Sequence, residues 1–305
     1  MKGNKIICLF LAALIWGFAF VAQSVGMDYI GPFTFNGIRS ILGGVVLIPV
    51  VLICLKAEKR TKMNTEKKTA TKADRKIVII GGITCGCIMF VATSLQQIGI
   101  QYTQAGKAGF LTALYVVIVP IISIFIGKKV HKKIWLCVAL SVGGMYLLCI
   151  SGTMSLGMGD ILVILCAVTF AVHILAVDYF VERMNGVLLS CLQFLISGAI
   201  ALIFMAIFEQ PSMQAILDAK VAILYAGILS CGAGYTFQIV GQKGVNPTVA
   251  SLILSLESVF SVIGGWLILH EILSAREVLG CVIMFAAIVI AQAPVEKLFL
   301  RKSAG

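Results

Sequence analysis

Ten apolar stretches, most of them close to 20 residues long, follow one another along the whole 305-residue chain. A helix of that length, rising about 1.5 Å per residue, crosses the roughly 30 Å hydrocarbon core of a bilayer. Helices are expected because lipid-exposed strands would leave backbone groups without partners, and the alternation typical of a membrane β-barrel is missing from the sequence. The predicted spans cover residues 6–26, 33–55, 77–98, 105–126, 134–151, 159–180, 187–208, 219–240, 247–269 and 277–294.

The composition indicates a chain that is solvated mainly by lipid. Hydrophobic residues make up 60% of it and charged residues 12%, and the mean hydropathy is +1.06. Soluble globular domains are much more polar. No segment between the predicted spans is long enough to fold a core of its own. We therefore predict an all-α integral membrane protein without a separate domain outside the bilayer.

Lysine and arginine are distributed unevenly between the two sets of connections. Twenty of the 24 lie in the set that includes both chain ends and the basic loop 56–76, whereas the alternate set holds only Lys107, Lys220 and Arg276. The positive-inside rule then predicts a multi-pass protein of the plasma (inner) membrane with both termini in the cytoplasm. The basic loop lacks aromatic residues, so we expect it to contact anionic lipid headgroups and expect no nucleic-acid partner.

Motifs that would indicate an enzyme or a metal site are incomplete. His270 and Glu271 begin like an HExxH zinc motif, but Ser274 occupies the position of the second histidine. Gly157-Met-Gly-Asp160 matches the GxGD of intramembrane aspartyl proteases, yet the preceding span holds no second acid to share a proton with Asp160, and a helix cap explains this residue. The ten cysteines lie in apolar stretches without a CxxC. We expect no enzymatic activity, no metal and no cofactor.

A weak internal repeat relates the two halves of the chain. Laying residue 96 over residue 238 gives seven identities in 31 aligned positions, pairs Gln96 with Gln238, and places Tyr115 opposite Glu257. Because both halves are rich in a few apolar residue types, several identities are expected by chance alone. The register is more informative, because it lays the end of one span, the turn and the next span over their counterparts in the other half.

The repeat predicts an architecture. A second overlay, of residues 33–39 on 187–193, pairs Arg39 with Gln193 at similar depths in their spans. Each half has five spans, and because five is odd the second copy would be inserted upside down, as in secondary transporters with a site at the midplane. We predict ten transmembrane helices in two inverted five-helix repeats, 1–151 and 152–305, around a central cavity.

Several short motifs, in their order and spacing, resemble the EamA-type branch of the drug/metabolite transporter superfamily over nearly the whole chain. These motifs are Trp16-Gly-Phe-Ala-Phe, Pro32 followed by Arg39, Gly109-Phe-Leu-Thr-Ala-Leu-Tyr115 leading to Pro120, Gly159-Asp160, Gln193-Phe194, Leu256-Glu257-Ser258-Val-Phe and His270-Glu271. The resemblance implies two inverted five-helix repeats, a central cavity, and export or exchange of amino acids, metabolites, nucleotide sugars or drugs. Ser258 replaces a common proline, and His270 a common glycine, which leaves the subfamily open.

Glu257 is the leading candidate site residue. It lies roughly 16 Å into the span that follows Asn246 and Pro247, near the bilayer midplane, where an ionisable group is costly and indicates a functional site. Its carboxyl group is suited to exchange a proton or to bind a substrate amine. The alternative is a structural hydrogen bond from a protonated acid to a neighbouring helix.

Other polar and aromatic residues inside the spans are further candidates for the cavity. Arg39 could bind a substrate carboxylate or phosphate, extend outward to the headgroups, or pair with Asp28. Asp178 is expected in a surface cluster with Glu182 and Arg183. The remaining candidates, for which packing or interhelical hydrogen bonding is the alternative, are Trp16, Gln96, Tyr115, His173, Gln193 and Gln238.

The sequence therefore predicts a secondary active transporter. It would move a small metabolite, amino acid or drug-like solute by alternating access, as an exporter or exchanger, with coupling to a proton or a counter-substrate. A channel-like facilitator and a membrane-embedded enzyme are the alternatives. The substrate, the coupling ion, the direction of transport and the choice between monomer and homodimer stay open at this stage.

Overall fold

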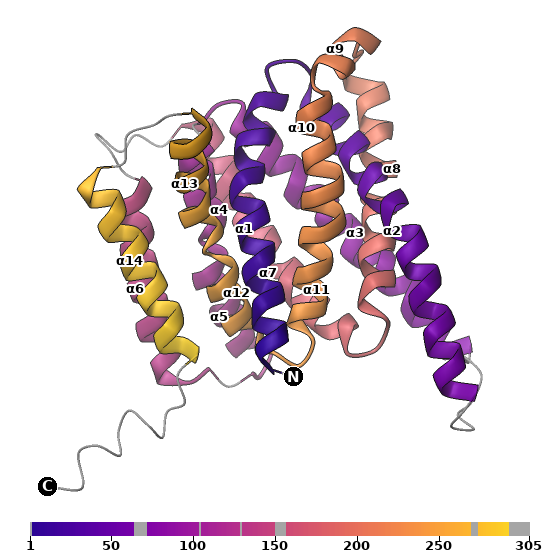
Figure 1. Ribbon diagram of the computed structural model, residues 1–305, viewed down its shortest axis with the longest axis horizontal. Coiled ribbons are helices and arrows are strands. Elements are labelled where there is room, and N and C mark those ends of the chain that lie inside the picture. The colour runs from indigo at the N-terminus through magenta and orange to yellow at the C-terminus, as the bar shows by residue number, and fades with distance from the viewer. Residues whose placement is uncertain are drawn as a thin grey trace, which may run out of the picture.

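The computed structural model describes residues 2–63, 72–103, 105–128, 130–149, 157–269 and 274–292, and within these ranges all regular structure is helical (Figure 1). This confirms the all-α prediction. Eight helical segments have the length and apolar composition to cross a membrane. They are Gly3–Gly26, Pro32–Ala57, Arg75–Ile100, Lys107–Phe125, Met158–Val181, Gly186–Phe208, Lys220–Gln242 and Pro247–Ile268.

The helices follow the predicted spans closely. In the first half they are α1 (Lys2–Gly26), α2 (Pro32–Met63), α3 (Lys72–Ile100), α4 (Ala105–Ala113), α5 (Tyr115–Phe125) and α6 (Lys132–Cys149). In the second half they are α7 (Met158–Val181), α8 (Gly186–Phe208), α9 (Met213–Asp218), α10 (Lys220–Leu224), η1 (Tyr225–Gly234), α11 (Tyr235–Gln242), α12 (Pro247–Leu254), α13 (Glu257–Leu269) and α14 (Ala275–Gln292). The two predicted spans outside the eight long segments coincide with α6 and α14, each of 18 residues.

The helices form one bundle with two distinct edges. α6 and α14 pack together at one edge, and α2 packs on α8 at the other (Figure 1). α1 lies between these edges, against α13 on one side and η1 and α11 on the other. The start of α1 and the end of α14 lie at the same end of the bundle.

Glycines allow two of these contacts to be very close. A Cβ on Gly17 would lie 2.3 Å from the Cβ of Phe260, so this glycine lets α1 lie directly on α13. A Cβ on Gly43 would lie 2.9 Å from the carbonyl oxygen of Gly227, which brings α2 equally close to η1. Small residues serve this role in membrane proteins because they allow backbones to approach. The two contacts arrange α13, α1, η1 and α2 around a common space.

Two of the membrane-length segments are broken near their middle. The chain between α4 and α5 turns at Leu114, and the chain between α12 and α13 turns at Ser255 and Leu256. The amide of Leu114 donates to Leu111 (3.3 Å) and that of Leu256 to Ile253 (3.2 Å), which are tighter i−3 bonds in place of the α-helical pattern. Tyr115 and Glu257 are therefore the first residues of α5 and α13.

A third irregularity is η1, a ten-residue π-helix in the span Lys220–Gln242. A π-helix is wider than an α-helix and usually appears only as a single turn, often beside a functional site. Here it spans Tyr225–Gly234 and continues directly into α11. Ser230 therefore lies on irregular backbone within this apolar span.

The acids near the ends of α7 have partners that differ in part from those expected. Asp160 accepts a hydrogen bond from the amide of Gly157 (2.8 Å), as a helix cap should, and also pairs with Lys107 (2.7 Å). At the other end, the prediction of a cluster of Asp178 with Glu182 and Arg183 is wrong in its partners. Asp178 instead pairs with Lys128 of the first half of the chain. His270 and Glu271 lie outside the described residues.

The other two members of that expected cluster also have separate partners. Glu182 accepts a hydrogen bond from the amide of Gly244 (2.6 Å), and the guanidinium of Arg183 lies 3.7 Å from the ring centre of Tyr179. The predicted cluster is wrong because the prediction considered only residues that are close together on one helix. The residues that arrive from other helices decide the pairing.

Candidate functional site

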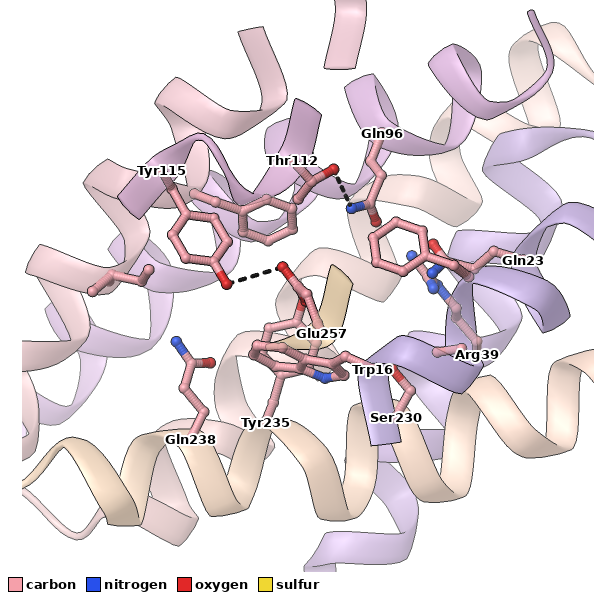
Figure 2. Close-up of a pocket in the computed structure, with 14 residues that line it drawn as sticks. Trp16, Gln23, Arg39, Gln96, Thr112, Tyr115, Ser230, Tyr235, Gln238 and Glu257 are labelled. Atoms are coloured by element: carbon pink, nitrogen blue, oxygen red, sulfur yellow. Dashed lines mark hydrogen bonds between the residues drawn. The ribbon is translucent and has the colours of Figure 1, made fainter. Parts of the chain in front are cut away.

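A cavity with polar groups in its wall lies between the two broken segments (Figure 2). α1, α2, α3, α4, α5, α7, η1, α11 and α13 all contribute to its wall. Nearly every side chain in the wall is buried, so the space lies inside the bundle. The lining residues are Trp16, Ala19, Phe20, Gln23, Arg39, Gln96, Thr112, Tyr115, Phe170, Ile174, Ser230, Tyr235, Gln238 and Glu257.

Glu257 and Tyr115 meet inside this cavity. The Tyr115 hydroxyl donates a 2.9 Å hydrogen bond to Oε1 of Glu257, and both residues are at most 4% exposed. Each begins the helix that follows a break, which turns its side chain toward the other helix and into the cavity (Figure 2). The repeat overlay placed these two residues at equivalent positions, and the structure brings the equivalent positions into contact. No ion pair joins Glu257 to a cation in the described ranges.

Arg39 lies in the wall of the same cavity and is 3% exposed. Its guanidinium lies 5.2 Å from the ring centre of Phe35, and its Nε donates no hydrogen bond to a described residue. Among the described residues, which include Asp28, no acid forms an ion pair with it. The two structural alternatives, a side chain extended outward and a pair with Asp28, are therefore not seen.

Three more predicted candidates line the cavity. Gln96 donates from Nε2 to the hydroxyl of Thr112 (3.2 Å), while Oε1 of Gln238 has no hydrogen-bond partner. The Trp16 ring packs on Tyr235 at 4.4 Å between centroids, tilted by 54°. The cavity wall thus combines aromatic faces with amide groups.

His173 and Gln193 do not reach the cavity. They are fully buried and bonded to each other, with 3.0 Å between His173 Nε2 and Gln193 Oε1. The His173 ring meets Tyr235 edge-on at 6.4 Å, so the pair lies behind the aromatic wall. Six of the eight predicted candidates are therefore brought together, and these two form a separate interhelical bridge.

Sequence reasoning missed four polar lining residues: Gln23, Thr112, Ser230 and Tyr235. Gln23 carried a usable signal, since it is an amide inside the first apolar stretch. Thr112 and Ser230 are small hydroxyl residues of a kind that is common throughout the spans, so nothing distinguished them. The position of Tyr235 depends on the π-helix before it, which no motif predicts.

Comparison with known proteins connects this architecture to membrane transport. The model of the EamA-like transporter family matches residues 3–150 and again residues 157–292. An "uncharacterized transporter" of Archaeoglobus fulgidus is 28% identical over 287 residues, covering 92% of this chain and 83% of that protein. The "uncharacterized transporter YoaV" of Bacillus subtilis is 25% identical over 283 residues, covering 90% and 92%.

A solved crystal structure shares the fold. Its TM-score is 0.76 at 16% sequence identity, and the match covers 96% of this chain and 97% of the other. At that identity the likeness concerns the arrangement of helices alone.

Proposed function

The chain belongs to the EamA-like transporter family, and with it to the drug/metabolite transporter superfamily, and it is a multi-pass membrane protein. From this premise we propose that it is a secondary active transporter. It binds a small polar solute in the cavity around Glu257 and exposes that cavity alternately to the two sides of the membrane, as an exporter or exchanger. Glu257 binds the coupling proton or a donor group of the solute.

One observation carries the proposal: the cavity lies where two membrane-length segments break at equivalent positions. The overlay of residue 96 on residue 238 lays the turn at Leu114 on that at Leu256. Transporters with inverted repeats use broken helices of this kind to bind substrates at the midplane, because backbone that leaves the helix is tolerated only where it lines a protein-enclosed space. The same overlay pairs Gln96 with Gln238, and both line the cavity.

The packing supports two inverted repeats of five spans each. α2 packs on α8 and α6 on α14, which pairs the second and fifth spans of one half with their counterparts in the other. α3, the third span of the first half, packs on α7, the first span of the second half. In the same way α1, the first span of the first half, packs on η1 and α11, which belong to the third span of the second half. The family model also matches once in each half. We therefore treat α6 and α14 as the fifth and tenth spans and place the repeat boundary at residues 151–152.

Orientation follows from charge. The start of α1 and the end of α14 share one end of the bundle with the end of α2, where the basic stretch 56–76 begins (Figure 1). The positive-inside rule assigns that end to the cytoplasm of a plasma membrane. The loop that holds Asn246 and Pro247 then lies inside, and α12 rises from it toward Glu257.

The closed wall of the cavity favours a carrier over a channel. Of the side chains that line it, Glu257, Arg39 and Gln238 are each at most 4% exposed. A channel needs a continuous open path for its solute, whereas a carrier encloses its site while it changes sides. The burial of these polar groups therefore favours a carrier over an open channel.

Counterflow in proteoliposomes tests the proposal. Vesicles loaded with a high concentration of unlabelled solute are diluted into a trace of labelled solute. A carrier accumulates the labelled solute transiently above its equilibrium level. This happens because a binding site that has released unlabelled solute outside returns to the inside with labelled solute bound. Simple equilibration without overshoot would indicate a channel-like facilitator, and chemical conversion of the solute would indicate an enzyme.

A further inference from the structure

Besides Trp16 and Gln238, three polar side chains of the cavity wall make no hydrogen bond to the described residues. Gln23 of α1, Arg39 of α2 and Ser230 of η1 are 4%, 3% and 3% exposed. In the described part of the chain, no hydrogen bond or ion pair is made by any of these three side chains, and Arg39 Nε and Gln23 Oε1 are completely enclosed without one. They lie on the same side of Glu257 in Figure 2.

Such groups are costly to bury. A guanidinium is charged at every physiological pH, carries five N–H donors and accepts nothing. Buried polar groups in folded proteins nearly always have partners, and a buried charge without a counter-charge is the most unfavourable case. Three side chains in this condition, from three different helices of one cavity wall, indicate that the missing partner is a ligand.

The charge in the wall restricts that ligand to a singly charged anion. Arg39 is the only cation among the lining residues, and Glu257, an acid, lines the same cavity. A phosphate dianion would need a second cation, which the described lining residues do not supply. A carboxylate carries one charge and matches the planar guanidinium through two parallel N–H···O bonds. The Ser230 hydroxyl and the amide nitrogen of Gln23 can each add one further donor, and the unpartnered Gln23 Oε1 can accept from a donor group of the solute.

We propose that Arg39, Gln23 and Ser230 form a carboxylate subsite. The rest of the solute then extends toward Glu257 and Gln238, whose oxygens accept hydrogen bonds from an amino or hydroxyl group. The solute class is a small monocarboxylate that bears such a donor. This inference rests on the proposed function, because it takes the cavity as the transport site.

The test compares each acid with its neutral amide on purified wild-type protein. Thermal unfolding is followed in a chloride-free buffer with the common amino acids, their carboxamides, lactate and inorganic phosphate. A ligand that binds only the folded state raises the unfolding temperature with its concentration. We expect at least one amino or hydroxy acid to stabilise the protein and its carboxamide to have no effect.

Two variants of Arg39 separate binding from structure. Arg39→Gln should weaken binding of the stabilising acid about 30-fold or more, because it removes the charge and the forked donors. Arg39→Lys keeps the charge but loses the paired N–H donors of the guanidinium. Its affinity for the acid should therefore lie between that of the wild type and that of Arg39→Gln. Without ligand, Arg39→Gln should unfold at the same temperature as the wild type or higher, because an uncompensated buried charge is removed. A purely structural Arg39 would give the opposite, a lower unfolding temperature.

The outcomes are distinct. Carboxamides that bind as well as the acids, binding of inorganic phosphate alone, full binding by Arg39→Gln, or no response to any acid would each overturn the subsite. Counterflow on the same preparation reports the proposed function separately. Transport of a solute without a carboxylate would preserve the carrier and remove the subsite. Binding of an acid without counterflow would preserve the subsite and remove the carrier.

Discussion

The charged side chains at the two ends of the cavity differ in whether the protein supplies a hydrogen-bond partner for them. At one end the Glu257 carboxyl group receives a hydrogen bond from Tyr115, its equivalent in the other half of the chain. At the other end the Arg39 guanidinium lies near an aromatic ring and donates no hydrogen bond to the described residues. The protein supplies a hydrogen-bond partner for Glu257, whereas in the proposed subsite the partner of Arg39 is a ligand.

This difference assigns different roles to the two charges. A group with a protein partner can exchange that partner during a conformational change, as a coupling residue must. A group without one contributes mainly when a ligand arrives. The predictions below test this division by altering one end at a time.

The largest effect is expected at the acid end. Glu257→Gln keeps the size of the side chain and can still accept a hydrogen bond from Tyr115, but it carries no charge and binds no exchangeable proton. We expect uptake of a transported solute into vesicles to fall about 100-fold and to lose its dependence on a pH gradient.

Glu209→Gln is the matched control for this change. Glu209 lies outside the cavity, where it accepts hydrogen bonds from the amides of Phe33 (2.8 Å) and Thr34 (2.7 Å) at the start of α2. Its amide variant should keep transport within a few-fold of the wild type. Unchanged, gradient-dependent uptake by Glu257→Gln would remove the coupling role.

The next effect concerns the helix contact that holds the acid end in place. Gly17→Ala would place a methyl group 2.3 Å from the Cβ of Phe260 and push α13, with Glu257, away from α1. Overpacking of this kind costs about 1–3 kcal/mol. We expect a lower unfolding temperature and reduced transport. Gly143→Ala in α6, which has no neighbour within 4 Å, should instead keep or raise the unfolding temperature. Equal effects of the two changes would contradict this account of the contact.

A smaller effect is expected from the hydrogen bond that closes the acid end. Tyr115→Phe keeps the ring but leaves the Glu257 carboxyl group without its partner. The free energy of unfolding should fall by about 1.5 kcal/mol, as for a buried hydrogen bond to a carboxyl group, and transport should slow about tenfold. Chemical unfolding and initial uptake rates measure the two effects. A variant with unchanged stability would show that the bond contributes nothing.

The smallest effect belongs to the basic end. Ser230→Ala removes one donor that has no protein partner, so the unfolding temperature without ligand should not change. Binding of the stabilising carboxylate should weaken about threefold, as for one neutral hydrogen bond. Titration by thermal shift measures both. A loss of stability without ligand would show that Ser230 has a structural partner and would weaken the contrast between the two ends.

The sequence predicts the helices well because span length is set by the bilayer. Each predicted span has a helical counterpart whose bounds differ by a few residues, for instance 187–208 against Gly186–Phe208. The two breaks were not predicted. Neither Leu114 nor Ser255 is a proline or a glycine, and the π-helix has no sequence signature either. These features arise from packing between helices that are distant in the chain.

The site was predicted in part for a related reason. Lipid-facing and protein-facing sides of these helices are both apolar, so periodicity does not show which way a polar residue points. Arg39 and Gln193 occupy matched depths in the overlay, yet Arg39 lines the cavity and Gln193 binds His173 behind it. Gln96 and Gln238, which the repeat overlay also pairs, both line the cavity.

The central claim is that the transported solute binds in this cavity, and Trp16 offers a direct report on it. Trp16 is a lining residue, whereas Trp135 and Trp266 are not, so the double variant Trp135→Phe, Trp266→Phe leaves a single reporter in the wall. Its fluorescence is titrated with a solute that shows counterflow. We predict a saturable change at concentrations that also saturate counterflow, and its loss in the Arg39→Gln background. Saturating counterflow with no change in Trp16 fluorescence would place the binding site elsewhere and contradict the account.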